Sequence, residues 1–136
     1  MSGPSQVKRR ILVVDDEPFV CDAVRMMLCF DGHEVRTATS GKEGLAEYEN
    51  GVFDLVITDY AMPVMKGDEF AAAIKKLNPK QPVVMITAYA EAFQASGIQV
   101  SSVDFVLSKP FLLENLREAI AKVAPASSHN GTQPAK

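Results

Sequence analysis

Hydrophobic residues along this chain gather in five short runs at regular intervals, and runs of this length predict β-strands. Four runs are almost continuously apolar and the second is weaker; they cover residues 11–14, 34–38, 53–57, 83–86 and 103–107. Between the runs, apolar residues recur every three or four positions, which is the period of a helix that buries one face. The pattern therefore predicts strands and helices in alternation.

The helical segments also carry signals for where they begin and end. Ser40 and Glu43 have the spacing of a capping box, and Asn50-Gly51 is expected to end the helix that they begin. The expected apolar faces of the first, third and last helices are Val20, Val24, Met27 and Leu28; Phe70, Ile74 and Leu77; and Leu113, Leu116, Ile120 and Val123. The fourth segment, residues 90–96, has a poor apolar stripe and is expected to form a short, weakly anchored helix.

Five strand–helix repeats predict an α/β protein with a (βα)5 chain. Nearly continuous apolar strands are typical of a parallel sheet that is covered by helices on both faces. Right-handed crossovers then favour a doubly wound parallel five-stranded sheet with the flavodoxin-like strand order 2-1-3-4-5. In such sheets ligands bind at the carboxyl ends of the strands, so the residues placed there become the candidates for function.

Composition and charge narrow the class of protein. The chain has 136 residues, 47% of them hydrophobic and 23% charged, as in an ordinary soluble globular domain. Its formal net charge of −3 argues against direct binding to nucleic acid. No apolar run approaches the roughly 20 residues needed to cross a bilayer, and no signal-peptide core is present. We therefore expect a cytoplasmic protein without membrane insertion.

The predicted domain spans residues 9–124, between a flexible N-terminal segment at 1–8 and a flexible tail or linker stub at 125–136. The basic cluster at residues 8–10 is interpreted as solvated charge. Cys21 and Cys29 lack a C-x-x-C pairing and are interpreted as reduced, partly buried thiols on a helix rather than metal ligands.

Polar side chains follow four of the predicted strands at the point where each strand ends. Asp15 and Asp16 follow the first strand, Asp59 ends the third, Thr87 ends the fourth and Lys109 follows the fifth. Taken singly, Asp59 could cap a strand, Thr87 could fill the core and Lys109 could be a solvated charge. Because the carboxyl ends of parallel strands meet at one edge, their shared placement favours a common site.

The residue types at this edge point to phosphoryl chemistry. Carboxylates held close together repel one another unless a cation compensates them, and Mg²⁺ prefers oxygen ligands of this kind. A site with acids, Mg²⁺, a lysine and a hydroxyl suits a phosphoryl group. The chain has no G-x-x-x-x-G-K-[ST] loop, so the phosphoryl group would arrive on another molecule or on a side chain. Asp59 is the central candidate for a carboxylate nucleophile.

Four sequence elements together resemble the receiver domain of bacterial two-component response regulators. They are Asp15-Asp16, the stretch D-Y-A-M-P-V-M-K-G at 59–67, Thr87-Ala88 and Lys109-Pro110-Phe111, in this order and approximate spacing. The resemblance runs from about Arg10 to Val123, which is nearly the whole chain.

This resemblance implies a role for each residue of the candidate site. Asp59 would be the phosphoacceptor, and Asp16, Asp59 and the backbone carbonyl of Ala61 would bind Mg²⁺, with Asp15 acting largely through a water molecule. Thr87 and Lys109 would contact the phosphoryl oxygens, and the peptide bond between Lys109 and Pro110 would be cis.

The implied activity is that of a signalling switch rather than an enzyme. The donor would be a histidine kinase or a histidine phosphotransfer protein, and the downstream effector is unknown. The domain would catalyse only its own phosphorylation and dephosphorylation.

The sequence departs from the family pattern at one position, and two other positions near the site have no fixed residue type in the family. Many receivers carry an aromatic residue three positions before the lysine, whereas this chain has Val106, with Phe105 expected on the other face of the strand. Ala61 and Tyr89 flank the site at positions that vary in the family and are expected to tune the phosphate lifetime.

Two other hypotheses stay open at this point. A Mg²⁺-dependent phosphohydrolase with an aspartyl-phosphate intermediate usually carries a second acid two residues after the nucleophile, where this chain has Ala61. A phosphorylation-independent docking module would bind its partner equally well after Asp59→Asn. Two nearby residues are expected to be structural: Met62 would fill space beneath the loop after Asp59, and Gly67 would relieve strain at the start of a helix.

Overall fold

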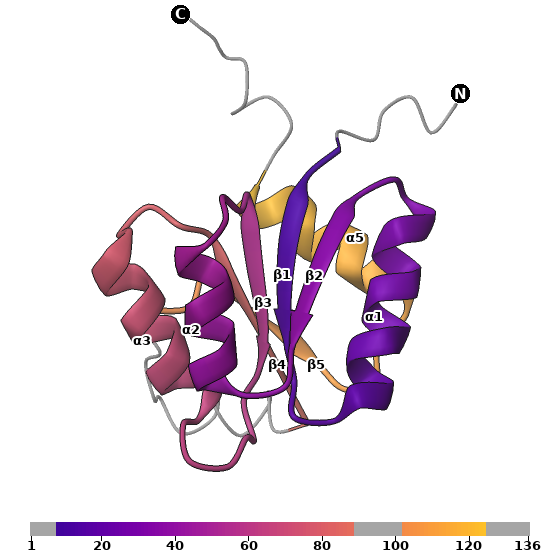
Figure 1. The fold of residues 1–136 in the computed structure, drawn as a ribbon. Helices are drawn as coiled ribbons and strands as arrows, with labels where there is room; N and C mark the ends of the chain where they lie inside the picture. Colours follow the sequence, from indigo (N-terminus) through magenta and orange to yellow (C-terminus); the bar gives the residue numbers. More distant parts are fainter. Residues whose placement is uncertain (1–7, 89–101, 125–136) are drawn as a thin grey trace, which may run out of the picture.

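Five parallel strands form the central sheet of the protein (Figure 1). The structure is a computed structural model and describes residues 8–88 and 102–124. The strands are β1 (Arg10–Val14), β2 (Glu34–Ala38), β3 (Leu55–Asp59), β4 (Val83–Thr87) and β5 (Phe105–Ser108). Their order in the sheet is β2-β1-β3-β4-β5, which confirms the predicted fold class and strand order.

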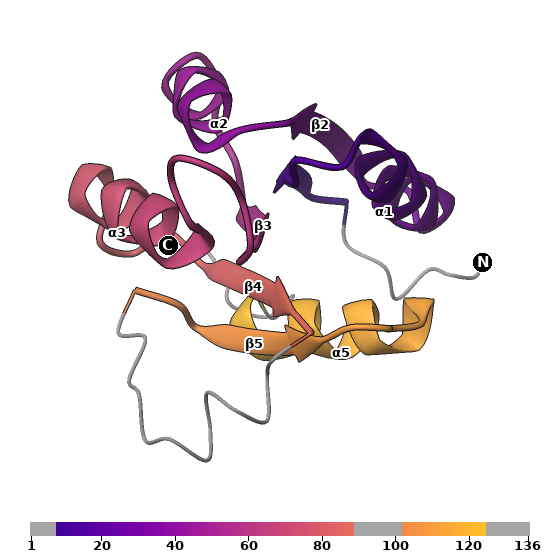
Figure 2. The ribbon, with the colours of Figure 1, turned by 90° about the horizontal axis from the view of Figure 1, so that it is seen from below.

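Helices cover both faces of this sheet. They are α1 (Pro18–Phe30), α2 (Gly41–Glu49), α3 (Gly67–Leu77) and α5 (Leu113–Val123). Figure 2 shows α2 and α3 on one face and α1 and α5 on the other. The helix expected at residues 90–96 lies outside the described residues. Within the described part of the chain, no helix is long and apolar enough to cross a membrane.

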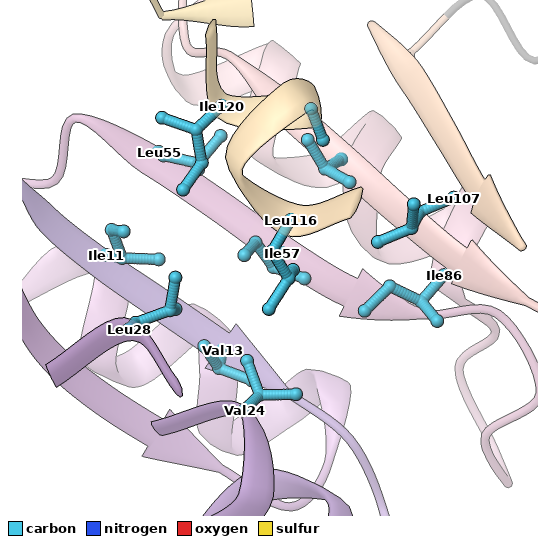
Figure 3. Close-up of a cluster of buried hydrophobic side chains, with 12 residues drawn as sticks. Ile11, Val13, Val24, Leu28, Leu55, Ile57, Ile86, Leu107, Leu116 and Ile120 are labelled. Atoms are coloured by element: carbon cyan, nitrogen blue, oxygen red, sulfur yellow. The ribbon is translucent and has the colours of Figure 1, made fainter. Parts of the chain in front are cut away.

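The core is divided by the sheet into two apolar clusters. Alternate residues of β1 point to opposite faces, so Ile11 and Val13 contribute to one cluster and Leu12 and Val14 to the other. The cluster beneath α1 and α5 is drawn in Figure 3 and includes Val24, Leu28, Leu55, Ile57, Leu107, Leu116 and Ile120. Because both faces of the sheet are covered, its central strands are apolar at nearly every position, as predicted.

Half of the predicted capping box forms at the start of α2. The Ser40 hydroxyl accepts a hydrogen bond from the Glu43 N–H at 3.0 Å, which satisfies an N–H group that has no partner within the helix. The Glu43 carboxylate accepts the N–H of Thr39 at 2.6 Å, one residue before the N-cap, instead of the N–H of Ser40 that a capping box requires.

Two strands begin later than the sequence predicts, because an aspartate side chain accepts an inter-strand hydrogen bond at each of these positions. The carboxylate of Asp54 accepts the N–H of Arg10 at 2.8 Å, so β3 begins at Leu55 rather than at residue 53. The carboxylate of Asp104 likewise accepts the N–H of Val83 at 2.8 Å, and β5 begins at Phe105 rather than at 103.

Some expectations about which residues are buried were wrong. Arg9 is buried: its N–H donates to Nδ1 of His33 at 3.1 Å, and its guanidinium donates to the carbonyl of Ala124 at the end of α5. Leu77 was expected on the buried face of α3 but is 53% exposed. Cys21 is buried as expected, whereas Cys29 is exposed.

Candidate functional site at the carboxyl ends of the strands

The sheet brings the predicted polar residues to one edge. The N–H of Asp15, just after β1, donates to the carbonyl of Ala38 at 3.1 Å. Asp59 is the last residue of β3 and Thr87 the last residue of β4. The N–H of Lys109, just after β5, donates to the carbonyl of Thr87 at 3.0 Å. The backbone hydrogen bonds of the sheet therefore fix the position of each of these residues at the edge.

Lys109 forms the closest charged contact at this edge. Its Nζ lies 2.8 Å from Oδ1 of Asp59 and 3.7 Å from Oδ2 of Asp15. Only 6% of the Asp59 side chain and 3% of the Asp15 side chain are exposed, so these charges interact with little screening by water. The peptide bond from Lys109 to Pro110 is cis, as expected.

The carboxylates of Asp15, Asp16 and Asp59 form a cluster that fits a divalent cation. One oxygen from each lies within 4.8 Å of the others. Oδ1 of Asp15 accepts the N–H of Glu17 at 2.9 Å, while its Oδ2 is buried without a hydrogen-bond partner. A buried carboxylate oxygen of this kind needs a partner, and a cluster of oxygen donors is what Mg²⁺ prefers.

The pKa values at the site reflect burial and the neighbouring charges. Burial raises the pKa of Asp15 to about 6, and the negative charges of Asp59 and Asp16 raise it further. The hydrogen bond from the Glu17 N–H and the positive charge of Lys109 act in the opposite direction. Burial by itself lowers the pKa of Lys109. The hydrogen bond to Asp59 and the negative charges of Asp59 and Asp15 outweigh burial, so the pKa of Lys109 is raised. Lys109 is therefore positively charged at neutral pH.

Replacing Asp15 by asparagine is expected to stabilise the metal-free protein at neutral pH. A raised folded-state pKa means that folding favours protonated Asp15, so the stability that this group contributes falls as pH rises from about 4 to about 6. In EDTA, Asp15→Asn should raise the free energy of unfolding by on the order of 1 kcal/mol at pH 7.5 and by much less at pH 4. Urea unfolding at both pH values measures this, and an equal gain at both would contradict it.

The loop after Asp59 is held close beneath the site. Met62 is buried, as expected for a residue that fills space under the loop. Gly67 was expected to relieve strain at the start of a helix, and the strain that it avoids is steric, since its φ is not positive. A Cβ at Gly67 would lie 2.2 Å from the Asp59 carbonyl oxygen. Glycine is needed there because α3 approaches the Asp59 backbone too closely for any side chain.

Val64, in the same loop, is fully exposed and has a φ of 70°. This left-handed conformation is unfavourable for a β-branched residue and is better tolerated by asparagine. Val64→Asn is expected to raise the free energy of unfolding by about 0.5–1 kcal/mol. Val52→Asn serves as the control, since Val52 is also exposed but has no positive φ. An equal gain from both variants in urea unfolding would show that backbone strain is not the cause.

Sequence reasoning missed the contribution of Cys21. Its thiol donates to the carbonyl oxygens of Asp15 at 3.3 Å and Ala38 at 3.5 Å, so it supports the turn that carries the acids. Burial, followed by the charge of Asp15, raises the pKa of this thiol to about 11, which keeps it protonated. The only sequence signal is the spacing of Cys21 with Val24 and Leu28 on one helix face.

Comparison with known proteins decides the family. The family model described as the response regulator receiver domain matches residues 11–121. The chain belongs to this family. The chain is 36% identical over 121 residues to the transcriptional regulatory protein ZraR of Escherichia coli K12, a match that covers 88% of this chain and 27% of ZraR. The chain thus spans only about a quarter of the length of that relative.

Solved structures agree with this assignment. A response regulator receiver domain protein from Clostridium thermocellum matches with a TM-score of 0.79 and 31% identity, over 88% of this chain and 97% of that one. The response regulator TrrA from Thermotoga maritima, solved in complex with Mg²⁺-BeF, matches with a TM-score of 0.77 and 35% identity, over 86% and 99%. The chain is thus a receiver domain of the two-component signalling type.

The departure at Val106 is visible in the structure of this receiver. Phe105 packs against the cluster under α1 and α5, in which Leu107 is also buried, while Val106 lies between them on the opposite face of β5 and is half-buried. The face that carries an aromatic side chain in many receivers therefore carries valine here. Tyr89 lies outside the described residues.

Proposed function

We propose that this receiver domain is a phosphorylation-dependent switch that accepts a phosphoryl group on Asp59 in a two-component phosphorelay. The donor is a histidine kinase or a histidine phosphotransfer protein. The observation that carries the proposal is the 2.8 Å contact between Lys109 Nζ and the buried Asp59 carboxylate, inside an acidic cluster that fits Mg²⁺. This contact supports a site in which Asp59 acts as the nucleophile, Lys109 as a fixed cation and the acidic cluster as the Mg²⁺ ligands.

In this proposal an Asp59 oxygen attacks the phosphorus atom of the phosphohistidine donor. A P–O bond forms, the P–N bond breaks, and the electron pair stays on the imidazole, which takes up a proton. Lys109 then donates to one phosphoryl oxygen instead of to Asp59, and the hydroxyl of Thr87 donates to another. Positioned donors of this kind stabilise charge that develops on the transferred group.

The residues that would hold Mg²⁺ are Asp16, Asp59 and the backbone carbonyl of Ala61, with Asp15 contributing through a water molecule. When bound, Mg²⁺ supplies positive charge that offsets the charge of the acids and of the phosphoryl oxygens. The buried Oδ2 of Asp15, which accepts no hydrogen bond, supports this arrangement.

Phosphorylation would add a charge of about −1.5 to −2 at the carboxyl ends of the strands and change the surface that the domain presents to an effector. The responding face is proposed to include β5 and the segment that precedes it. Because Val106 replaces the aromatic residue found in many receivers, the response would not depend on the inward swing of an aromatic ring. The effector is a separate protein or domain, and residues 9–124 make no direct contact with nucleic acid. Its place of action is the cytoplasm.

The test is the stoichiometry of phosphorylation. With acetyl phosphate and Mg²⁺, intact-mass spectrometry should show at most one phosphoryl group per chain, and none when EDTA replaces Mg²⁺. The domain would catalyse only its own phosphorylation and dephosphorylation, so para-nitrophenyl phosphate should not be turned over. Sustained release of para-nitrophenol would instead support the phosphohydrolase hypothesis. A phosphorylation-independent docking module would instead bind its partner equally well after Asp59→Asn.

A further inference from the structure

Glu17 lies between the acids of the site and the first turn of α1. Its backbone is held on both sides: the N–H donates to Oδ1 of Asp15 at 2.9 Å, and the carbonyl oxygen accepts the N–H groups of Val20 and Cys21 at 3.0 and 3.1 Å. The side chain, in contrast, is exposed and makes no capping hydrogen bond to the helix that it precedes. The backbone of Glu17 is therefore fixed, while its carboxylate faces solvent.

Glu17 and Lys109 line the same groove. This groove has a volume of about 580 Å³ and lies between α1 and Pro110-Phe111. Among the described residues that line it, Glu17 and Lys109 carry the only charges, and the others are apolar. Apolar walls screen charges less than open water does, so both charges act on a group that enters the groove beside them.

Glu17 also acts on the ammonium group that is proposed to hold the phosphoryl group. Against the effect of burial, the hydrogen bond to Asp59 and the charges of Asp59, Asp15 and Glu17 raise the pKa of Lys109. Asp59 and Asp15 are buried and belong to the nucleophile and the proposed Mg²⁺ site, whereas Glu17 is exposed. Of these three acids, Glu17 is the one whose charge an incoming phosphoryl donor meets in the groove.

This position affects the leaving group of the donor, because the leaving group is bonded to the same phosphorus atom whose oxygen Lys109 would hold. With acetyl phosphate, an Asp59 oxygen attacks phosphorus, the P–O bond to the acetyl group breaks, and acetate leaves with a negative charge. With phosphoramidate, the P–N bond breaks, the electron pair stays on nitrogen, and the NH₃⁺ group leaves as neutral ammonia. The two leaving groups thus differ by one unit of charge in the donor and in the transition state.

We propose that Glu17 is a specificity residue that makes the site prefer phosphoryl donors with a protonated nitrogen leaving group over acyl phosphates. Its carboxylate attracts the nitrogen leaving group, of which the imidazole of phosphohistidine is the protein form, and repels a departing carboxylate. At roughly 6 Å and with the screening expected at an exposed site, one unit of charge changes a rate by about three- to ten-fold. The inference rests on the proposed phosphorylation of Asp59 and adds the choice of donor to it.

The second-order rate constants for phosphorylation by phosphoramidate and by acetyl phosphate test this proposal. They are measured by intact-mass spectrometry on the full 136-residue chain at saturating Mg²⁺. Glu17→Gln should lower the ratio of the phosphoramidate constant to the acetyl phosphate constant by about three- to ten-fold, and Glu17→Lys should lower it further. The ratio is the readout because a change in folding or in Mg²⁺ affinity would alter both rate constants alike and cancel.

Glu49→Gln is the matched control for Glu17→Gln. Glu49 is also an exposed glutamate, but it is the last residue of α2, which runs from the carboxyl end of β2 to the opposite edge of the sheet. Its replacement should leave the ratio unchanged. A ratio that stays at the wild-type value in Glu17→Gln and Glu17→Lys, while both donors still label the chain, would overturn this inference alone. If neither donor labelled the wild-type chain, the proposed function would fail and the inference with it.

Discussion

Lys109→Met is expected to lower the rate of phosphorylation by acetyl phosphate by about 10²- to 10³-fold. The variant removes the ammonium group that lies 2.8 Å from Asp59 and would stabilise the transferred phosphoryl group. It should not weaken Mg²⁺ binding, because removing a positive charge leaves the acids of Asp15 and Asp59 less compensated and more attractive to a cation. Intact-mass time courses and Mg²⁺ titrations by NMR measure the two effects separately.

Lys66→Met is the matched control for this variant. Lys66 lies in the loop after Asp59, with its Nζ 5.6 Å from the centre of the Tyr60 ring, and has no ion pair with the acids among the described residues. Its replacement should leave the rate within about two-fold of the wild type. A comparable loss in both variants would mean that Lys109 acts only through the general field of positive charge.

Gly67→Ala is expected to destabilise the protein by about 2–3 kcal/mol and to impair phosphorylation at the same time. The new Cβ would lie 2.2 Å from the Asp59 carbonyl oxygen and 2.8 Å from Cα of Tyr60, and both are backbone atoms. Neither can rotate away, so the start of α3 or the end of β3 must shift. Because the end of β3 carries the Asp59 carboxylate, the shift would misplace it relative to Lys109.

Gly51→Ala is the control for Gly67→Ala. Its Cβ would meet the side-chain ring of Phe53 at 3.1 Å, which is a tight contact but one that a small ring movement can relieve. We expect a loss below about 1 kcal/mol in urea unfolding, with phosphorylation unchanged. If Gly67→Ala proved as mild as Gly51→Ala, the close approach of α3 to the Asp59 backbone would not constrain the site.

The sheet and its polar edge were predictable because they depend on local periodicity. Continuous apolar runs identify strands that are buried on both faces, and parallel strands must place their carboxyl ends together. Asp15, Asp59, Thr87 and Lys109 therefore could be assigned to one edge before any distance was known. The strand starts were harder, because the carboxylates of Asp54 and Asp104 replace backbone ladder bonds at these positions.

Contacts between distant segments away from this edge could not be predicted from a single sequence. Arg9 resembles a solvated charge in its basic run, yet it bonds to His33 and to Ala124, 24 and 115 residues away. The requirement for glycine at position 67 likewise depends on the approach of a strand end, not on local turn geometry.

Direct mapping of the phosphorylated residue tests the central claim that Asp59 is the phosphoacceptor. The protein would be treated with acetyl phosphate and Mg²⁺, reduced with borohydride to convert the acyl phosphate to homoserine, and digested for tandem mass spectrometry. We predict homoserine at position 59 in the wild type and no homoserine anywhere in Asp59→Asn. Homoserine at position 15 or 16 of the wild type, or undiminished labelling of Asp59→Asn, would contradict the account.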